Sequence, residues 1–284
     1  MDEHPSGPEE GAPAVSGYRV VRRLGEDALS RWYEAELRGR VHLRVLRPGL
    51  ADDQAALDMF HADTERAAGL RHATALGVVV AGGMHAAVGA AGRTLADELA
   101  TGWPLGEVIA LAYARDLAAA AACIDARDLA HRNVTPSAVH LGAGGEARLA
   151  VLGDLVPRKV LAAQRGRLTQ DPRYAAPELI TGNAPIDGRS ATYVLGGVLF
   201  HMLAGSPPHP ASSPLAMARA HLRDDFPRIG EVRSDLTAGV ADLCVACTER
   251  EPLLRPPPEK LVVLLAALHA RAARRTPHLQ RRAP

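Results

Sequence analysis

The chain has 284 residues, of which 47% are hydrophobic, 23% charged and only 4% aromatic. This composition is sufficient for a buried core and excludes a disordered or collagen-like protein. The 33 basic residues almost balance the 32 acidic ones, so the net charge of +1 gives no general attraction to polyanions. We therefore expect neither nucleic acid nor an anionic membrane as a partner.

The longest apolar runs span residues 193–205 and 261–267, and both are shorter than the roughly 20 residues that cross a bilayer. Residues 1–17 are acidic and rich in Pro and Gly, which is not the pattern of a signal peptide. We therefore predict a cytoplasmic protein without a membrane span. The three cysteines are too few for a disulfide framework, and we interpret Cys244 and Cys247 as buried helical thiols.

Residues 1–16 show no apolar period and are predicted to form a disordered tail. The folded part of the chain is expected to begin near Tyr18. Short strands are predicted at residues 19–24, 31–37, 42–46, 76–80 and 85–88, with one long helix at residues 53–70. This pattern indicates a small β-rich N-lobe with a single long helix, covering residues 17–90.

After Gly92 the apolar period changes to that of helices. Helices are predicted at residues 94–100, 105–130, 177–181, 190–204, 214–222, 237–248 and 258–272, with two strand-like segments at 138–141 and 147–152 and an irregular stretch at 153–176. A larger helical C-lobe would thus cover residues 91–270, followed by a basic tail at 271–284. The predicted fold class is α+β, with a ligand cleft between the lobes.

Five short segments resemble, in order and spacing, those of bacterial eukaryotic-like (Hanks-type) Ser/Thr protein kinases. Residues 41–53 resemble the third strand of that family, residues 131–141 its catalytic loop, residues 172–178 the end of its activation segment and residues 187–196 the start of its central helix. The pair Arg255-Pro256 resembles the late arginine motif. The resemblance covers about residues 18–269 and implies a bilobal protein-kinase-like fold.

Phosphoryl transfer in this family requires a glycine-rich phosphate cradle and a lysine. The corresponding loop retains only Gly25 of three glycines, and Asp27 adds a negative charge where the phosphates would lie. Arg44 occupies the lysine position, and no lysine precedes Lys159. Because a planar guanidinium does not replace a compact ammonium, we predict a degenerate nucleotide site.

The long helix of the N-lobe should supply a glutamate that pairs with the lysine. The register places Asp63 at that position, with Glu65 as the less favoured alternative. A pair between Arg44 and Asp63 would hold this helix inward, which is a structural role.

The catalytic-loop positions are also changed. The family's aspartate is Asn133, which accepts no proton near neutral pH, and the following lysine is Thr135. The two metal-binding positions are Ala138 and Val151, neither of which offers an oxygen to Mg²⁺. Asp154 lies up to about 10 Å further along an extended chain, so it would need a register shift to serve instead.

The resemblance implies apolar walls for an adenine at Val41, Val88 and Leu141. Since the phosphate and metal positions are altered, we expect no bound cofactor, with ATP binding weak at most, no Mg²⁺ and no other metal site.

Residues that the family uses for structure are retained. Glu178 and Arg255 are expected to form a buried ion pair, and His131 and Arg132 persist in the catalytic loop. The central-helix aspartate that supports this loop in the family is Ala191, so a loss of support is expected. Thr169 is the candidate phosphorylation site of the activation segment, with Arg132 and Arg167 as its expected phosphate contacts.

These observations favour a pseudokinase that acts non-catalytically, as a scaffold or as an allosteric or docking module. The alternative is a weak or atypical ATP-dependent protein Ser/Thr kinase or nucleotidyl transferase that gives new roles to the altered cleft residues Arg44, Asp63, Asn133 and Asp154. The third hypothesis is that an unrelated ligand binds in the cleft. The resemblance implies a protein partner, either an active Ser/Thr kinase or a phosphothreonine-binding domain.

Overall fold

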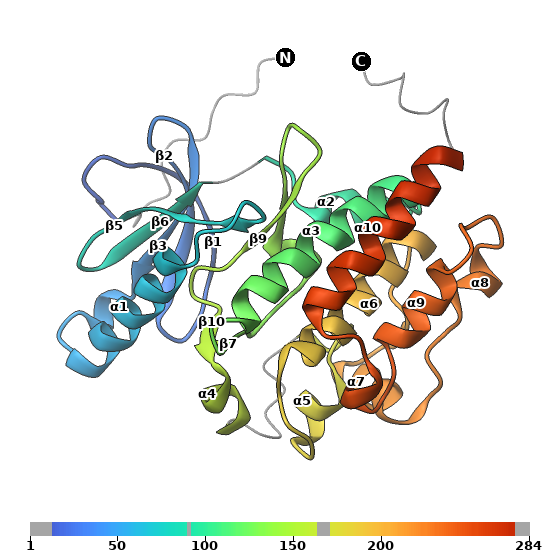
Figure 1. Ribbon diagram of the computed structural model, residues 1–284. Coiled ribbons are helices and arrows are strands. Elements are labelled where there is room, and N and C mark those ends of the chain that lie inside the picture. Colours follow the sequence, from blue (N-terminus) through green and yellow to red (C-terminus); the bar gives the residue numbers. More distant parts are fainter. Residues whose placement is uncertain (1–12, 90–91, 164–170, 276–284) are drawn as a thin grey trace.

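The computed structural model describes residues 13–89, 92–163 and 171–275 (Figure 1). It has a β-rich N-terminal lobe with one long helix and a larger helical C-terminal lobe, so the predicted bilobal α+β arrangement is confirmed. The candidate phosphorylation site Thr169 and its expected contact Arg167 lie outside the described residues.

The N-lobe is an antiparallel sheet in the order β1-β2-β3-β6-β5. Its strands are β1 (Arg19–Glu26), β2 (Ser30–Glu36), β3 (Arg40–Leu46), β5 (Val78–Ala81) and β6 (His85–Gly89). Side chains alternate between the two faces. On β3, Val41 and Leu43 join the apolar cluster of one face, whereas Leu46 packs with Phe60 on the other.

Helix α1 (Gln54–Gly69) covers the second face, and its N-terminus is capped by Asp53, whose carboxylate accepts the N–H groups of Ala55 and Ala56. On the first face Val15 packs against the sheet, so part of the predicted tail before residue 17 belongs to the fold.

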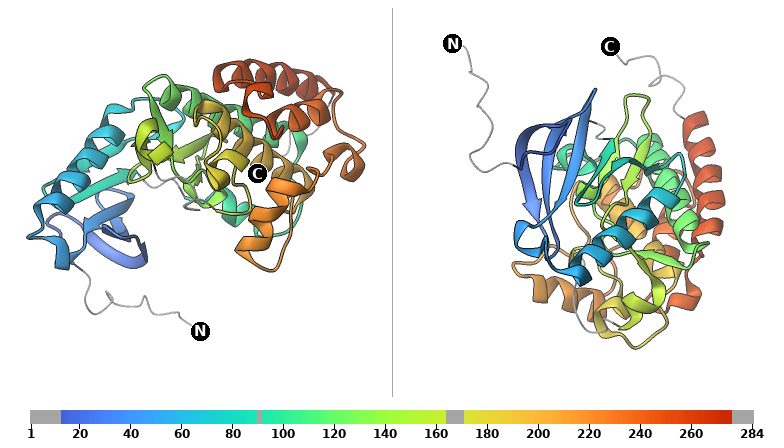
Figure 2. Two further views of the ribbon diagram at one scale, coloured as in Figure 1. Left: turned by 90° about the horizontal axis from the view of Figure 1, so that it is seen from below. Right: turned by 90° about the vertical axis from the view of Figure 1, so that its left-hand side faces the viewer.

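The C-lobe is built around α6 (Gly188–Ala204), which is buried along most of its length. Helix α3 (Glu107–Asp125) packs between α6 and the final helix α10 (Pro258–Arg275), as the two views of Figure 2 show. The remaining helices are α2 (Leu95–Leu99), α5 (Pro177–Thr181), α7 (Pro214–Arg223), α8 (Ile229–Val232) and α9 (Val240–Cys247). Helix α10 continues through Arg275, so the predicted basic tail begins too early.

Two small sheets line the C-lobe side of the cleft. One has the order β4-β9-β8, from β4 (Ala75–Leu76), β9 (Ala147–Ala150) and β8 (Val139–Leu141); the other pairs β7 (Leu129–His131) with β10 (Leu155–Pro157). Strand β4 precedes the last N-lobe strands in the chain but pairs in parallel with β9.

Several elements differ from the prediction. The helix predicted to reach residue 130 ends at Asp125, because Asp128 adopts a left-handed φ of 58° and β7 follows. Strand β10 and helix α4 (Arg158–Ala163) lie in the stretch expected to be irregular, and α8 was not predicted. The unpredicted elements β10, α4 and α8 are short, and their stability comes from tertiary contacts such as the bonds between Arg158 and Asp128 rather than from local periodicity.

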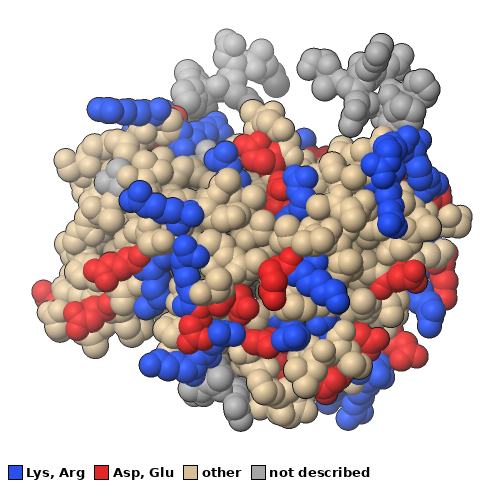
Figure 3. Space-filling model, viewed as in Figure 1, with Lys and Arg blue, Asp and Glu red and all other residues tan. Residues whose placement is uncertain are grey.

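Acidic and basic side chains are mixed across the face seen in Figure 3, as the near-zero net charge suggests. Among the described helices, none combines the length and apolar character that a bilayer crossing requires.

Candidate functional site

Arg44 and Asp63 meet in the cleft behind the N-lobe sheet. Strand β3 directs Arg44 towards α1, where its Nη2 lies 3.3 Å from Asp63 Oδ2. Asp63 also accepts a hydrogen bond from Arg66, whose Nε donates to the Leu155 carbonyl at 2.9 Å. Since Leu155 lies in β10, this network ties α1 to both lobes. Glu65, the alternative partner, is exposed.

The Arg44 side chain is only 1% exposed. Its guanidinium carbon lies 4.7 Å from the centre of the Phe60 ring and 5.7 Å from that of Trp32. Two of its nitrogens, Nε and Nη1, have no hydrogen-bond partner among the described residues. Burial lowers the pKa of Arg44, while Asp63 and Asp27 oppose this effect. An arginine nevertheless remains charged, so the cleft holds a buried cation.

The turn between β1 and β2 is closed by Asp27. One oxygen of its carboxylate accepts the N–H groups of Leu29 and Ser30, at 2.8 and 2.7 Å. Asp27 therefore binds its own turn, and these two N–H groups are not available to an external anion. Gly25 lies at the end of β1, with no atom within 4 Å of where a Cβ would lie.

His42 and His140 contact each other across the cleft. His42 lies on the same face of β3 as Arg44, and its ring centre is 4.8 Å from that of His140 on β8, in an edge-to-face arrangement. Burial, followed by the neighbouring His140, lowers the pKa of His42 to about 4. The His42 ring is therefore predominantly neutral at pH 7.

Two of the three expected apolar walls face away from this cleft. Val41 belongs to the opposite, outer cluster of the sheet, and Leu141 packs against the core of the C-lobe. Both expectations are wrong by one residue, because alternation places their neighbours His42 and His140 at the cleft instead. Val88 pairs directly with His42 and shares its face.

The altered loop positions lie on the C-lobe side. Thr135 and Ser137 join through their hydroxyls at 2.9 Å, Ala138 packs against the core, and Val151 is fully buried. Ala138 and Val151 bring no oxygen into the cleft, and the described residues hold no cluster of three or more His, Cys, Asp or Glu side chains suited to a metal. Burial raises the pKa of Asp154, although His131, Arg132 and Arg44 lower it.

The catalytic-loop segment is well supported, contrary to the expectation drawn from Ala191. His131 Nε2 donates to the Ala150 carbonyl at 2.7 Å, and its Nδ1 accepts the N–H of Asn133 at 3.2 Å. Arg132 donates to the carbonyl of Gly153. Because both side chains bind backbone groups of the same lobe, they hold the loop without an aspartate at residue 191.

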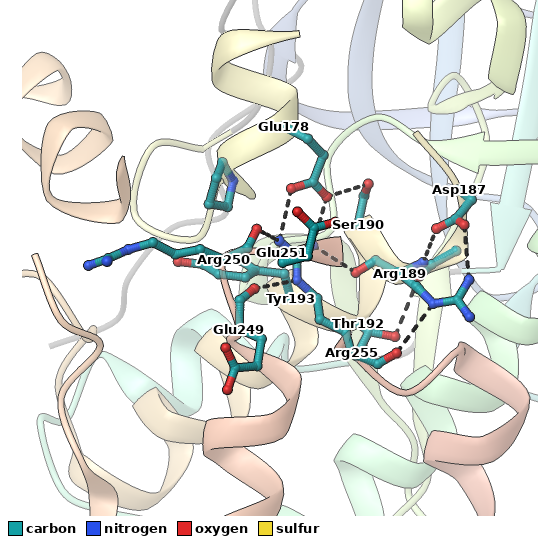
Figure 4. Close-up of polar contacts among 12 residues, drawn as sticks. Glu178, Asp187, Arg189, Ser190, Thr192, Tyr193, Glu249, Arg250, Glu251 and Arg255 are labelled. Atoms are coloured by element: carbon teal, nitrogen blue, oxygen red, sulfur yellow. Dashed lines mark hydrogen bonds and ion pairs between the residues drawn. The ribbon is translucent and has the colours of Figure 1, made fainter. Parts of the chain in front are cut away.

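Glu178 and Arg255 form the buried pair predicted from the sequence (Figure 4). Arg255 donates to both carboxylate oxygens, at 2.7 and 2.9 Å, and Ser190 adds a third hydrogen bond at 2.6 Å. The remaining Arg255 donors reach the carbonyls of Glu249, Arg250 and Arg189. Every charge in this pair is thus compensated, which fastens α5 to α6 and to the segment before α10.

No family model matches the chain. Among characterised proteins, it is 33% identical over 250 residues to the serine/threonine-protein kinase PknI of Mycobacterium tuberculosis, a match that covers 82% of this chain. It is 27% identical over 225 residues to PknB of the same organism, covering 73% of this chain, and 27% identical over 196 residues to PknB of Mycobacterium leprae. The chain is homologous to mycobacterial Hanks-type serine/threonine kinases.

This homology confirms the resemblance on which the sequence interpretation rests. The chain spans about 40% of the length of PknI and 36% and 31% of the two PknB proteins. In this kinase homologue, a cleft of about 920 Å³ remains open in front of the histidine pair, with Gly25, Trp32, His42 and Asn133 among its lining residues.

Sequence reasoning missed Trp32, His42 and His140 as cleft residues. The available signal was the register of β2 and β3, which pairs Trp32 with Arg44 and Glu34 with His42. Alternation then places all four on one face.

Proposed function

We propose that this kinase homologue is a pseudokinase, which acts as a scaffold or as an allosteric or docking module in Ser/Thr kinase signalling. The observation that carries the proposal is the pair of apolar side chains, Ala138 and Val151, at the positions that the homology assigns to the metal ligands. Without oxygen ligands Mg²⁺ has no protein site, and Asn133 supplies no base.

The histidine contact supports the absence of productive Mg-ATP binding. A planar base is held between two walls of a cleft only if each wall lies within ring-stacking distance of one face of the base. His42 and His140 already touch at 4.8 Å between ring centres, so no ring fits between them. The open volume that remains lies in front of this contact and is lined largely by polar side chains.

A protein partner follows from what the fold retains. The buried Glu178–Arg255 pair keeps the end of the activation segment in place, so the surface around it is preserved although the chemistry is not. The relatives are named serine/threonine-protein kinases, and we propose an active kinase of this kind, or a phosphothreonine-binding domain, as the partner, with cytoplasm as the compartment.

One observation favours the atypical-enzyme alternative. Asp154 carries a carboxyl group near Arg44 and Arg132, and burial raises its pKa. A perturbed acid in a cleft is a candidate catalytic group. Mg²⁺-dependent phosphate transfer that disappears in Asp154→Asn would support this alternative.

The deciding experiment is thermal unfolding with millimolar ATP, in Mg²⁺ and in EDTA, beside a transfer assay with radiolabelled ATP. A ligand at 100 times its dissociation constant stabilises by about 2.7 kcal/mol, which raises Tm by roughly 5–10 °C for a chain of this size. We expect no shift and no transfer. A shift that requires Mg²⁺, accompanied by transfer, would overturn the proposal.

A further inference from the structure

The β1–β2 turn, which corresponds to the phosphate-binding loop of the kinase relatives, packs against the N-lobe helix α1. Leu29, at the tip of this turn, is 8% exposed and packs with Leu46, Ala56 and Phe60 between β3 and α1. The turn therefore packs against α1 through Leu29, and this apolar contact stabilises the position of the turn.

Asp27 holds the β1–β2 turn in this position. One carboxylate oxygen accepts the N–H groups of Leu29 and Ser30, and the other accepts the indole Nε1–H of Trp32 at 3.0 Å. An anion of the chain thus makes the backbone contacts that a bound anion would otherwise make, and at the same time it fixes the direction of the indole ring.

Trp32 extends this contact to the other lobe. It faces Arg44 directly in the register of β2 and β3, with the guanidinium carbon 5.7 Å from its ring centre. A Cβ added to Gly153 of the C-lobe would lie 3.0 Å from Trp32 Cζ2 and 3.3 Å from the Arg44 guanidinium carbon. The indole and the guanidinium therefore pack directly against the backbone of Gly153, whose φ of 85° suits glycine.

We propose that residues 27–32 form a built-in latch, in which Asp27 and Trp32 keep the two lobes closed and α1 inward without any nucleotide. This inference extends the proposed function, because it names what occupies the cleft in place of a ligand. It follows that the closed conformation, and any surface it offers to a partner, does not depend on the nucleotide concentration.

The chain allows a direct test, because Trp32 and Trp103 are its only tryptophans and Trp103 is 75% exposed. Trp103→Phe leaves Trp32 as the single fluorescent reporter. In this background we compare iodide quenching before and after Asp27→Asn. An asparagine still offers one oxygen to the turn, but its NH₂ group opposes the indole N–H, so the change breaks chiefly the bond to Trp32.

Asp53→Asn is the matched control, since Asp53 also accepts two backbone N–H groups but caps α1 away from the indole. Because Trp32 is half-buried, we expect its fluorescence to be partly shielded in the background protein and in the Asp53→Asn control. Asp27→Asn should increase the open population at least about tenfold, seen as stronger quenching. Quenching of Trp32 as strong as that of free N-acetyltryptophanamide, or no response to Asp27→Asn, would overturn the latch.

Hydrogen exchange on the unmodified protein covers the case in which the variant fails to fold. The amides of Leu29 and Ser30 should be protected without nucleotide, and rapid exchange at both would also overturn the latch. Protected amides and shielded Trp32 together with Mg-ATP transfer would instead refute the pseudokinase proposal and leave the latch standing. The two failures are therefore distinguishable.

Discussion

Arg255 donates hydrogen bonds to both oxygens of Glu178, at 2.7 and 2.9 Å, with the two side chains 0% and 1% exposed. Glu178→Gln leaves the arginine as an uncompensated buried charge, which costs about 3–5 kcal/mol. We expect Tm to fall by roughly 10 °C or more. Glu36→Gln is the control, because Glu36 pairs with Arg19 on the surface and should contribute about 0–1 kcal/mol. Equal losses for the two variants would contradict the structural role of Glu178.

His42 should make the protein less stable in acid. Its folded pKa of about 4 lies below the value of about 6.5 in the unfolded chain, so the unfolded state takes up the proton first as the pH falls. The contribution of the neutral ring is complete above about pH 6.5 and is lost between that pH and about 4, on the order of 3 kcal/mol.

The groups that face His42 are His140, Glu34 and Arg22. Urea unfolding of wild type and His42→Phe at pH 7.5 and 4.5 measures its share. The variant should lose less stability between these pH values than wild type does, although His201 and His221, both with a pKa lowered to about 4, retain part of the effect. An unchanged difference would show that His42 is not buried beside His140.

The contact between α6 and α9 depends on Gly196. A Cβ at this position would lie 2.7 Å from Cys247 Cβ and 2.8 Å from Thr248 Cγ2, so Gly196→Ala should cost about 1–3 kcal/mol through overpacking. Gly69→Ala, at the end of α1, meets no atom within 4 Å and should be neutral or stabilising by about 0.4–1 kcal/mol. The urea midpoint at constant slope measures both. A tolerated Gly196→Ala would mean that the helices do not approach as described.

The cysteines should differ in reactivity. Burial raises the pKa of Cys244 to about 12 and raises that of Cys247 as well, and neither is exposed. Because the thiolate is the reactive form, titration of the native protein with Ellman's reagent should detect only Cys123 of the three thiols. Cys123→Ser should remove that signal, and denaturant should expose the other two. Rapid reaction of a second thiol in native Cys123→Ser would contradict the burial.

The sequence predicted the parts of the site that depend on residue type at a fixed position. The partner of Arg44 was assigned to Asp63 rather than Glu65, and the Glu178–Arg255 pair was predicted from two motifs that lie 77 residues apart. Both pairs follow from charge and family order, which the sequence displays directly.

The details of the cleft walls could not be predicted in this way. Val41 and Leu141 were chosen as walls because they are apolar, but a shift of one residue along a strand reverses the face. The polar side chains His42 and His140 meet at the back of the cleft in a contact between the two lobes, and the sequence shows no local sign of that contact. In the same way, the support of the catalytic loop by His131 depends on the carbonyl of Ala150, a backbone group whose position only the fold determines.

Strand β4 joins the lobes in a way that a boundary at residue 90 conceals. Ala75 and Leu76 pair with Leu149 and Ala150. If the chain were divided at residue 90, the C-lobe piece would lack β4, and the edge of β9 would be open to pairing with other chains. A chimera or split reporter made at this boundary would therefore combine two incomplete pieces. When lobes are exchanged with those of related proteins, residues 75–76 should be exchanged together with the C-lobe sheet. The hydrogen bonds, rather than the order of the chain, define the exchangeable unit.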